Sequence, residues 1–442
     1  MIHTAPSTIG TDFGTTNTVV AITHGDGDAL VLSFDGPSGQ VTAFRSALSF
    51  QTQPGRGSQP PQRLVEAGPW AIDAYVEEAL ETRFIQSFKS FAASAAFTDT
   101  MIDNRRYRFE DLLGAFLLQV RRRGGEALTS LPDRVIVGRP VTFAGGSPDE
   151  ALALGRYEDA FARLGFTDIR FAYEPVGAAF FFARTLQADA NVLVADFGGG
   201  TSDFSIVRYE RRDDGLRATP LSRSGVGVAG DAFDYRIIDQ LVSPELGKGS
   251  AYQTLGKTLP IPQRYYAAFA RWDQLALLGA SRDMRDIRAL ARTATEPEKL
   301  QRLIEIFDDN HGYALYQAIS TLKIALSDQE EALFSFIAGS IRIEKPVTRH
   351  EFEFWIAPEL RAIETAVDAA IARSGLDPDQ IDRVFLTGGS SFVPAVRRLF
   401  QARFGQDRIE TGGEFESIAS GLALIGREPD LDVWSHTRPS VS

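Results

Sequence analysis

The feature that most constrains the fold of this chain is a short pattern that occurs twice. The segments IGTDFGTTNTVVAIT (9–23) and VLVADFGGGTSDFSIV (192–207) each place an apolar run before Asp-Phe-Gly, then small and hydroxyl residues, then a second apolar run. Each copy predicts a strand, a tight turn and a returning strand. One copy alone would fit an ordinary hairpin. Two copies predict two halves of similar build that face one ligand.

The residues of the two turns indicate what that ligand is. Glycines let the backbone approach an anion closely, so that N–H groups of the turn can bind phosphate. Asp12 and Asp196 carry the carboxylate oxygens that a hard cation accompanying a phosphate prefers. The duplicated pattern therefore predicts phosphate binding from two sides.

A third element, TGGSSFVPAVRRLF (387–400), follows a short apolar strand near the C-terminus. The strand delivers Gly388 and Gly389 to a helix that Pro394 helps to start. Close approach of backbone to a flat base or a ribose would need glycines at this point. A routine strand–helix turn is the alternative interpretation.

Two other glycine patterns resemble nucleotide motifs without meeting their requirements. Gly225, Gly227 and Gly230 have the spacing of a dinucleotide fingerprint, but no buried strand precedes them and no ribose-binding acid follows in a clear βαβ unit. The Gly-Lys-Thr at 256–258 resembles the end of a P-loop, but Ala251 stands where its first glycine is required. We reject both interpretations.

Length and pattern predict the broad organisation. A chain of 442 residues is too long for one ordinary core, so we expect two domains or lobes. Alternating strands and helices before the second glycine turn predict an α/β lobe. We also expect residues 70–96 to be mostly helical and residues 349–374 to form one long helix.

Composition excludes several classes of function. The absence of cysteine excludes disulfides, thiol catalysis and Cys-ligated metals. A net charge of −12 argues against a protein that coats nucleic acid. No apolar run approaches the roughly 18 residues of a membrane span, and the N-terminus lacks the pattern of a secretory signal. We expect a cytoplasmic monomer that binds neither membranes nor nucleic acid.

Together with VIVGRPVTF (135–143) and FAYEPVGAAFFF (171–182), the duplicated turns give the chain a family resemblance. In order and spacing these motifs resemble the ATPase half of the 70-kDa heat-shock chaperone family, within the actin-like ATPase superfamily. The similarity covers nearly the whole chain and is greatest to the divergent YegD-like branch.

The resemblance implies the α/β actin-like ATPase fold, with two lobes that each contain a mixed β-sheet flanked by helices and a nucleotide cleft between them. Lobe I would span residues 1–190, with a smaller subdomain at about 41–109, and a C-terminal helix at about 414–428 would complete it. Lobe II would span residues 191–413, with a mostly helical subdomain at about 232–330. Residues 429–442 would form a polar tail, and no substrate-binding domain would follow.

The resemblance also implies roles on the phosphate side. Asp12 and Asp196 would hold hydrated magnesium. The phosphates would be surrounded by Gly14, Thr15, Thr16, Asn17, Gly198, Gly199, Gly200 and Thr201. In hydrolysis, Lys89 would interact with the γ-phosphate, and Glu174 and Asp203 would position water. Asp196 and Thr201 would also take part in this step. Without the resemblance, Lys89 reads as a surface lysine on a helix and Glu174 as an acid at a helix start.

On the adenosine side, the resemblance implies binding by Gly230, Lys323, Ser327, Gly388, Gly389, Ser390 and Phe392. Phe392 stands where the family has an arginine that stacks on adenine, and Ser320 and Ile324 also depart from the family pattern. Base preference is therefore expected to differ from the family norm. The implied ligands are ATP or ADP and Mg²⁺, with K⁺ as a further ion.

These features predict an ATP-binding, slowly ATP-hydrolysing protein related to the heat-shock chaperones but without their peptide-binding domain. It would act as a molecular chaperone or as a nucleotide-switched partner of an unknown protein or client. Two alternatives stay open. One is a small-molecule kinase of the same superfamily, and the other is a non-enzymatic actin-like scaffold or filament protein.

Overall fold

The structure is a computed structural model that describes residues 7–25, 27–37, 39–53, 61–78, 81–212, 215–270, 282–412 and 416–438. The beginning of the predicted C-terminal helix (414–415) and the end of the predicted tail (439–442) lie outside the described residues. The chain divides into two compact units. Unit 1 comprises Met1–Ala229, Ala362–Ser391 and Val396–Ser442, and unit 2 comprises Gly230–Arg361 and Phe392–Ala395. The lobe boundaries given above follow a different division and stay a prediction.

The first large sheet of unit 1 is built around the first copy of the duplicated pattern. Its strand order is β13-β12-β1-β2-β3, and β6 (Phe44–Arg45) also pairs with β2. The five strands are β1 (Thr8–Phe13), β2 (Asn17–Thr23), β3 (Leu30–Val31), β12 (Arg134–Arg139) and β13 (Asp168–Tyr173). The strands β1, β12 and β13 are parallel, whereas β2 and β3 join as antiparallel hairpin strands.

The second large sheet repeats this arrangement around the second copy. Its order is β16-β15-β14-β21-β22, with antiparallel pairing on one side of β14 and parallel pairing on the other. The strands are β14 (Ala190–Phe197), β15 (Ser202–Arg212), β16 (Gly215–Val226), β21 (Arg383–Thr387) and β22 (Ile409–Thr411). The duplication seen in sequence therefore extends to strand order and direction, which confirms the α/β class with two mixed sheets expected of the actin-like fold.

The prediction for residues 70–96 was wrong in its middle. The helix α1 (Pro69–Glu77) is followed by strand β9 (Thr82–Gln86) and a short 3-10 helix, η1 (Phe88–Phe91). Strand β9 pairs antiparallel with β7 (Ala47–Gln53), which also pairs with β8 (Gln62–Ala67). The β-branched residues Thr82 and Ile85, both buried, and the pairing with β7 explain the strand.

The prediction of one helix over residues 349–374 was also wrong, because two helices occupy this stretch. Helix α11 (Arg349–Trp355) begins with a capping box between Thr348 and Glu351. Helix α12 (Ala357–Ser374) follows after a break at Ile356. Pro358 lies in the first turn of α12, where its missing N–H costs nothing, but it could not continue α11.

The other helices of unit 1 flank the two sheets. They are α2 (Phe109–Arg123), α3 (Glu150–Ala162), α4 (Glu174–Ala183), α13 (Pro394–Phe404), α14 (Ser417–Ile425) and α15 (Leu431–Trp434). Unit 2 contains α5 (Gly230–Ile237), α6 (Arg264–Phe269), α8 (Arg282–Ala291), α9 (Pro297–Asp308) and α10 (Gly312–Asp328), with the hairpins β17–β18 (Ala251–Thr254, Lys257–Pro260) and β19–β20 (Glu331–Ala338, Ile341–Thr348). None of the described helices has both the length and the apolar content needed to cross a bilayer.

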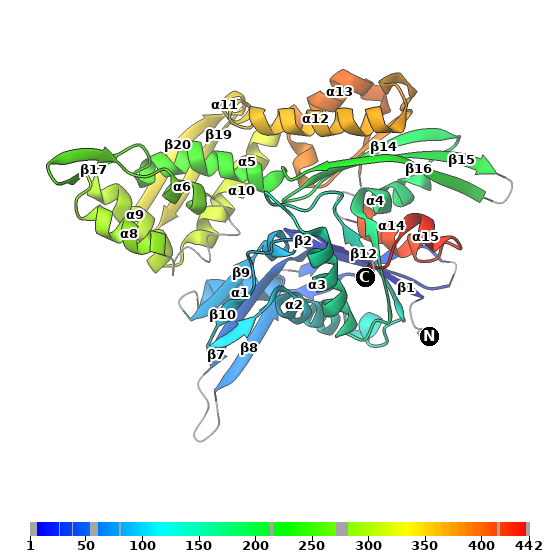
Figure 1. Cartoon of the computed structure of the whole chain (residues 1–442), viewed down its shortest axis with the longest axis horizontal. Coiled ribbons are helices and arrows are strands. Elements are labelled where there is room, and N and C mark those ends of the chain that lie inside the picture. Colours follow the sequence, from blue (N-terminus) through cyan, green and yellow to red (C-terminus); the bar gives the residue numbers. More distant parts are fainter. Residues whose placement is uncertain are drawn as a thin grey trace. The chain divides into compact units, whose positions relative to one another are not determined.

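Helix α14 packs tightly against α4 and against strand β1 of the first sheet (Figure 1). A Cβ atom at Gly421 would overlap the carbonyl oxygen of Gly177 in α4. A Cβ atom at Gly10 in β1 would likewise overlap the backbone of α14 at Ala419 and Ala423. Glycine at these positions is what allows the backbones to approach so closely.

The segment after α14 is docked on unit 1, although its sequence predicts a polar tail. Trp434 in α15 is buried and packs edge-on against Phe180 of α4, with ring centroids 4.7 Å apart. His436 forms an antiparallel bridge with Phe171, the N–H of each residue donating to the other's carbonyl at 2.8 and 3.0 Å. This segment thus extends the edge of the first sheet beside β13.

The Gly-Lys-Thr pattern at 256–258 lies in the β17–β18 hairpin. Leu255 and Gly256, the two turn residues, both have positive φ, at 47° and 71°. Such a two-residue turn joins two antiparallel strands, whereas a P-loop joins a strand to a helix. The rejection of a P-loop here is therefore confirmed.

Candidate functional site

The first turn joins β1 to β2 and is locked in a tight conformation. Asp12 lies near the end of β1, and the turn continues through Gly14 to Asn17. A Cβ atom at Gly14 would overlap the carbonyl oxygen of Asn17. The hydroxyl of Ser46 donates a hydrogen bond of 2.7 Å to the Gly14 carbonyl. This turn therefore requires glycine and is held in one conformation from the neighbouring segment.

The second turn joins β14 to β15 in the same way. Asp196 and Asp203 lie opposite each other across the two strands. The N–H of Gly198 donates to the carbonyl of Thr201 at 2.9 Å, which closes the turn. Both aspartates are buried. The strand–turn–strand predicted for residues 192–207 is confirmed.

The structure brings the two turns together within unit 1. A Cβ atom at Gly200 would lie 3.4 Å from the Thr15 hydroxyl oxygen and 3.6 Å from the Cβ of Ala144. Thr15 belongs to the first turn, Gly200 to the second, and Ala144 to the segment that follows β12. The predicted arrangement, in which small and hydroxyl residues of both turns face each other, agrees with this geometry.

Lys89 and Glu174 form a buried ion pair beside these turns. Lys89 Nζ lies 2.7 Å from Glu174 Oε1, and only 9% and 6% of the two side chains are exposed. Glu174 is the first residue of α4, and a Cβ atom at Gly138 in β12 would already crowd it at 3.1 Å. Burial by itself would lower the pKa of Lys89, but the charge of Glu174, with contributions from Tyr157 and Asp12, raises it overall. Lys89 is therefore a fixed positive charge inside the site.

The aspartates of the site hold protons more tightly than free aspartates do. Burial, followed by the negative charge of Glu174, raises the pKa of Asp12 and of Asp203 to about 7 each. Burial, then Glu174 and Asp12, raises the pKa of Asp196 well above its ordinary value. Lys89 lowers the pKa of Asp12 and Asp196 but does not offset the other effects. The site thus gathers more negative charge than its lysine can balance.

The residues present fit a hydrated divalent cation. Asp203 Oδ1 accepts hydrogen bonds from the N–H groups of Val141 at 2.8 Å and Thr142 at 3.3 Å. Its other oxygen, Oδ2, is buried and has no hydrogen-bond partner among the described residues. An orphaned carboxylate oxygen among mutually repelling acids is stabilised by a bound cation with oxygen ligands. Asp12 and Asp196, with Asp203 behind them, are the groups that would face it.

The third motif lies directly beside the second. Thr387, the last residue of β21, is in register with Asp196 of β14. Gly388 follows with a φ of 83°, and a Cβ atom there would overlap the carbonyl oxygen of Phe197. Gly389 has open space at its Cβ position, and Ser390 is buried. Glycine is required at Gly388 by both backbone conformation and close packing.

The remaining adenosine-side candidates belong to unit 2. Gly230 is the first residue of α5 and is buried. Lys323 in α10 pairs with Asp234 at 2.7 Å, and the hydroxyl of Ser327 donates to the Lys323 carbonyl at 3.0 Å. Phe392 is 41% exposed. The roles of these four residues in nucleotide binding stay predictions.

Several residues that shape the site were not singled out from the sequence. Gly225 lies opposite Asp203, and a Cβ atom there would overlap Asp203 Oδ1. Tyr157 in α3 is fully buried near the charges of Lys89. Arg139, at the end of β12, is fully buried, pairs with Glu150 and donates to the Pro140 carbonyl at 3.0 Å. An arginine inside the apolar run VIVGRP was a signal for the last of these, since a buried charge needs a partner.

The raised pKa values predict how Mg²⁺ affects stability at different pH. Free aspartate titrates near pH 3.9, whereas Asp12 and Asp203 titrate at about 7 in the fold. Their contribution to stability is present below about pH 4 and is lost as the pH rises through 7, because the folded state holds the extra protons. Mg²⁺ balances the negative charge of these aspartates only when they are ionised. Calorimetry should therefore show a larger Mg²⁺-dependent rise in melting temperature at pH 8 than at pH 6.

Asp12→Asn is the control for this measurement, because it removes one of the titrating groups and should reduce the difference between the two pH values. A Mg²⁺-dependent rise at pH 6 that equals or exceeds the rise at pH 8 would contradict the assignment.

Comparison with known proteins shows which family these features resemble. The family model described as Hsp70 protein matches residues 288–428. The chain is 24% identical to the Chaperone protein DnaK of Thermus thermophilus over 423 residues, which covers 94% of this chain and 60% of the relative. It is also 24% identical to the Chaperone proteins DnaK of Deinococcus proteolyticus and Deinococcus radiodurans, over 438 and 435 residues, with 94% of this chain and 58% of each relative covered.

The chain thus spans about three fifths of the length of the curated relatives that it matches. The similarity covers nearly the whole chain, and the family model covers its C-terminal part from residue 288 to 428. On these grounds, the chain is similar to the Hsp70 family.

Proposed function

We propose that this protein binds ATP or ADP with Mg²⁺ and slowly hydrolyses the γ-phosphate. The observation that supports the proposal most directly is the meeting of the two glycine turns beside the half-buried Asp12, three buried acids and one buried lysine. A cluster of acids that raise one another's pKa is suited to a cation, and two facing glycine turns are suited to the phosphates that accompany it.

We assign the following roles to residues of the chain. Backbone N–H groups and hydroxyls at Thr15, Thr16 and Thr201 would orient the terminal phosphate. Lys89 would place a positive charge where negative charge develops in the transition state. Glu174 holds Lys89 through one carboxylate oxygen, and it would position the attacking water with the other. Bound Mg²⁺ would neutralise charge on the phosphate oxygens.

Asp203 would have a different role from these residues. Its Oδ1 is occupied by the N–H groups that follow Pro140, whereas Oδ2 is free of hydrogen bonds to the described residues. The free oxygen would orient water of the metal shell, and the held oxygen would keep the carboxylate fixed. Catalysis of this type consists of positioning and electrostatic stabilisation, which is compatible with slow turnover.

We further propose that the protein is a cytoplasmic chaperone or nucleotide-switched protein. It would convert its nucleotide state into a signal for a protein partner. Similarity to the Hsp70 family supports this role. The assignment to the YegD-like branch stays a proposal. The adenosine would contact Gly388, Gly389 and Ser390, whereas the roles expected for Gly230, Lys323, Ser327 and Phe392 stay predictions from the resemblance. A change of nucleotide that alters these contacts would shift a conformational equilibrium.

Calorimetric titration with ATP and ADP tests the central claim. In the presence of Mg²⁺ we expect one nucleotide to bind, and we expect Asp12→Asn/Asp196→Asn to weaken binding by about tenfold or more, because two groups that hold the cation are neutralised. Asp159→Asn, an exposed aspartate on α3, is the matched control and should bind as the wild type does. Failure of the wild type to bind either nucleotide would overturn the proposal. Phosphoryl transfer to a metabolite in place of water would identify a kinase.

A further inference from the structure

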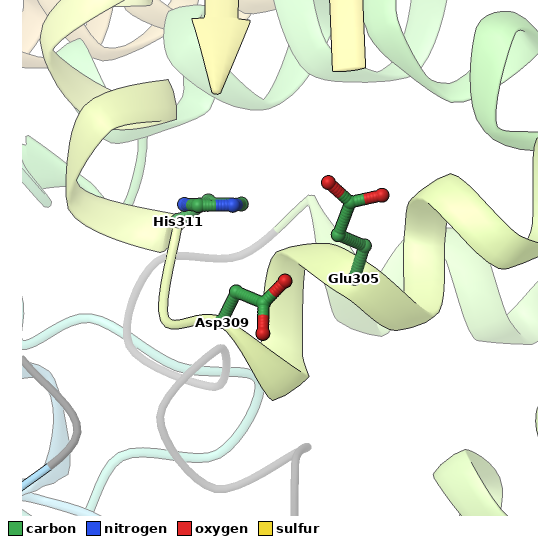
Figure 2. A group of neighbouring side chains, drawn as sticks. All are labelled: Glu305, Asp309 and His311. Atoms are coloured by element: carbon green, nitrogen blue, oxygen red, sulfur yellow. The ribbon is translucent and has the colours of Figure 1, made fainter. Parts of the chain in front are cut away.

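Three side chains with metal-binding atoms lie together in unit 2, separate in sequence from the acids described above. They are Glu305 in the last turns of α9, and Asp309 and His311 in the turn that leads to α10. One ligand atom from each lies within 4.8 Å of the others. Figure 2 shows the two carboxylates and the imidazole around a common space. Their spacing along the chain places them on one helix end and its following turn.

Glu305 is held in place by the turn between β19 and β20. The N–H of Ser340 donates to Glu305 Oε1 at 2.6 Å, and the Ser340 hydroxyl donates to Oε2 at 2.5 Å. Both hydrogen bonds lower the pKa of Glu305, and the one from the hydroxyl has the larger effect. The carboxylate is therefore ionised and oriented by a neighbouring segment, which is how proteins fix a ligand from the outer shell.

His311 provides a second, independent observation. Its Nε2 atom is buried but has no hydrogen-bond partner among the described residues. A buried polar atom normally has a partner, so this nitrogen calls for an explanation. The backbone of His311 is fixed, because its N–H donates to the Ile306 carbonyl at 2.9 Å and its carbonyl accepts from the N–H of Leu315 at 3.1 Å.

Gly339 shows that Glu305 and His311 converge on one place. Its φ is 56°, which favours glycine. A Cβ atom at this position would overlap Glu305 Oε1 and would lie 2.9 Å from His311 Nε2. The β19–β20 turn thus leaves room between a carboxylate oxygen and an unpartnered imidazole nitrogen. The carboxylate of Asp309, which is exposed, lies on the solvent side of the same group.

We propose that Glu305, Asp309 and His311 form a binding site for a divalent transition-metal ion of the Zn²⁺ class. One imidazole nitrogen and two carboxylate oxygens are ligands typical of Zn²⁺, whereas Mg²⁺ and Ca²⁺ prefer oxygen alone. Three protein ligands leave a coordination position for water. Bound metal would supply the missing partner of His311 Nε2 and would connect α9, the start of α10 and, through Ser340, the β19–β20 hairpin.

Titration of the full-length protein with Zn²⁺ tests the proposal. Excess Mg²⁺ is kept present throughout, so that the acids of unit 1 are occupied by the harder cation. We expect one Zn²⁺ per chain to bind. Ser340→Ala should weaken binding by about tenfold, and His311→Gln or Asp309→Asn by about a hundredfold, since ligands contribute more than the groups that orient them. His350→Gln removes an exposed histidine of the same unit and should leave binding unchanged.

A second measurement places the ion. Crystals of the full chain soaked with Zn²⁺ should show an anomalous scattering peak between the three side chains, and circular dichroism should show that each variant is folded. Asp12→Asn/Asp196→Asn should retain Zn²⁺ binding. The proposal is overturned if folded His311→Gln binds Zn²⁺ as the wild type does, if the wild type binds none at 100-fold excess over protein, or if the peak lies only at the acids of unit 1.

Discussion

Lys89→Met is expected to lower the rate of ATP hydrolysis by about 100- to 1000-fold while Mg²⁺–nucleotide binding changes little, because a fixed charge aimed at the transition state is lost. Lys89 is buried, its pKa is raised, and its Nζ is oriented by Glu174 at 2.7 Å. Single-turnover hydrolysis and calorimetric titration, measured on the same preparation, separate the chemical step from binding.

The ion pair itself requires a control, because removing one partner leaves a charge buried alone. Lys89→Met by itself should destabilise the fold by about 3–5 kcal/mol. The double variant Lys89→Met/Glu174→Gln should recover much of this stability, since no unpaired charge remains, but it should not recover hydrolysis. Lys345→Met, at a partly buried ion pair with Glu245, is the matched control. Hydrolysis restored in the double variant would show that Lys89 has only a structural role.

Gly421→Ala should destabilise the protein by about 3 kcal/mol or more, because the added methyl group would overlap the carbonyl oxygen of Gly177 and neither backbone can turn away. Urea unfolding followed by circular dichroism measures the loss, and hydrogen exchange in α4 and α14 locates it. Gly114→Ala is the matched control. Gly114 lies inside α2 with open space at its Cβ position, so alanine there should be neutral or stabilising by up to about 1 kcal/mol. Equal effects at the two glycines would contradict the close packing of α4 and α14.

The sequence was most informative where a local pattern specifies a local structure. The Asp-Phe-Gly turns at 12–14 and 196–198 were both predicted at the right residues, and the first requires glycine because a Cβ atom at Gly14 would overlap the Asn17 carbonyl oxygen. Their repetition predicted two lobes that face one ligand, and the structure shows that the two large sheets share one topology. In each case neighbouring residues along the chain determine the conformation.

The parts that sequence reasoning missed depend on contacts between distant segments. Lys89 and Glu174 are 85 residues apart, and only a family resemblance, with no local pattern, singled out the lysine. Thr82–Gln86 is a strand because β7 lies beside it, and a helical pattern around it concealed this pairing. At Gly225 the requirement for glycine comes from the Asp203 side chain on the neighbouring strand. Such requirements exist only in the assembled fold.

Helix α14 has a consequence for how the chain acquires its structure during synthesis. The helix occupies residues 417–425, yet it packs on strands that begin at Thr8. At a synthesis rate of about 5–20 residues per second, roughly 20 to 80 s separate the emergence of β1 from that of α14. The surface of β1, β2 and β12 that α14 covers in the folded protein stays uncovered until α14 is made. The newly made chain therefore presents, while it is being translated, the kind of exposed surface that leads proteins to aggregate.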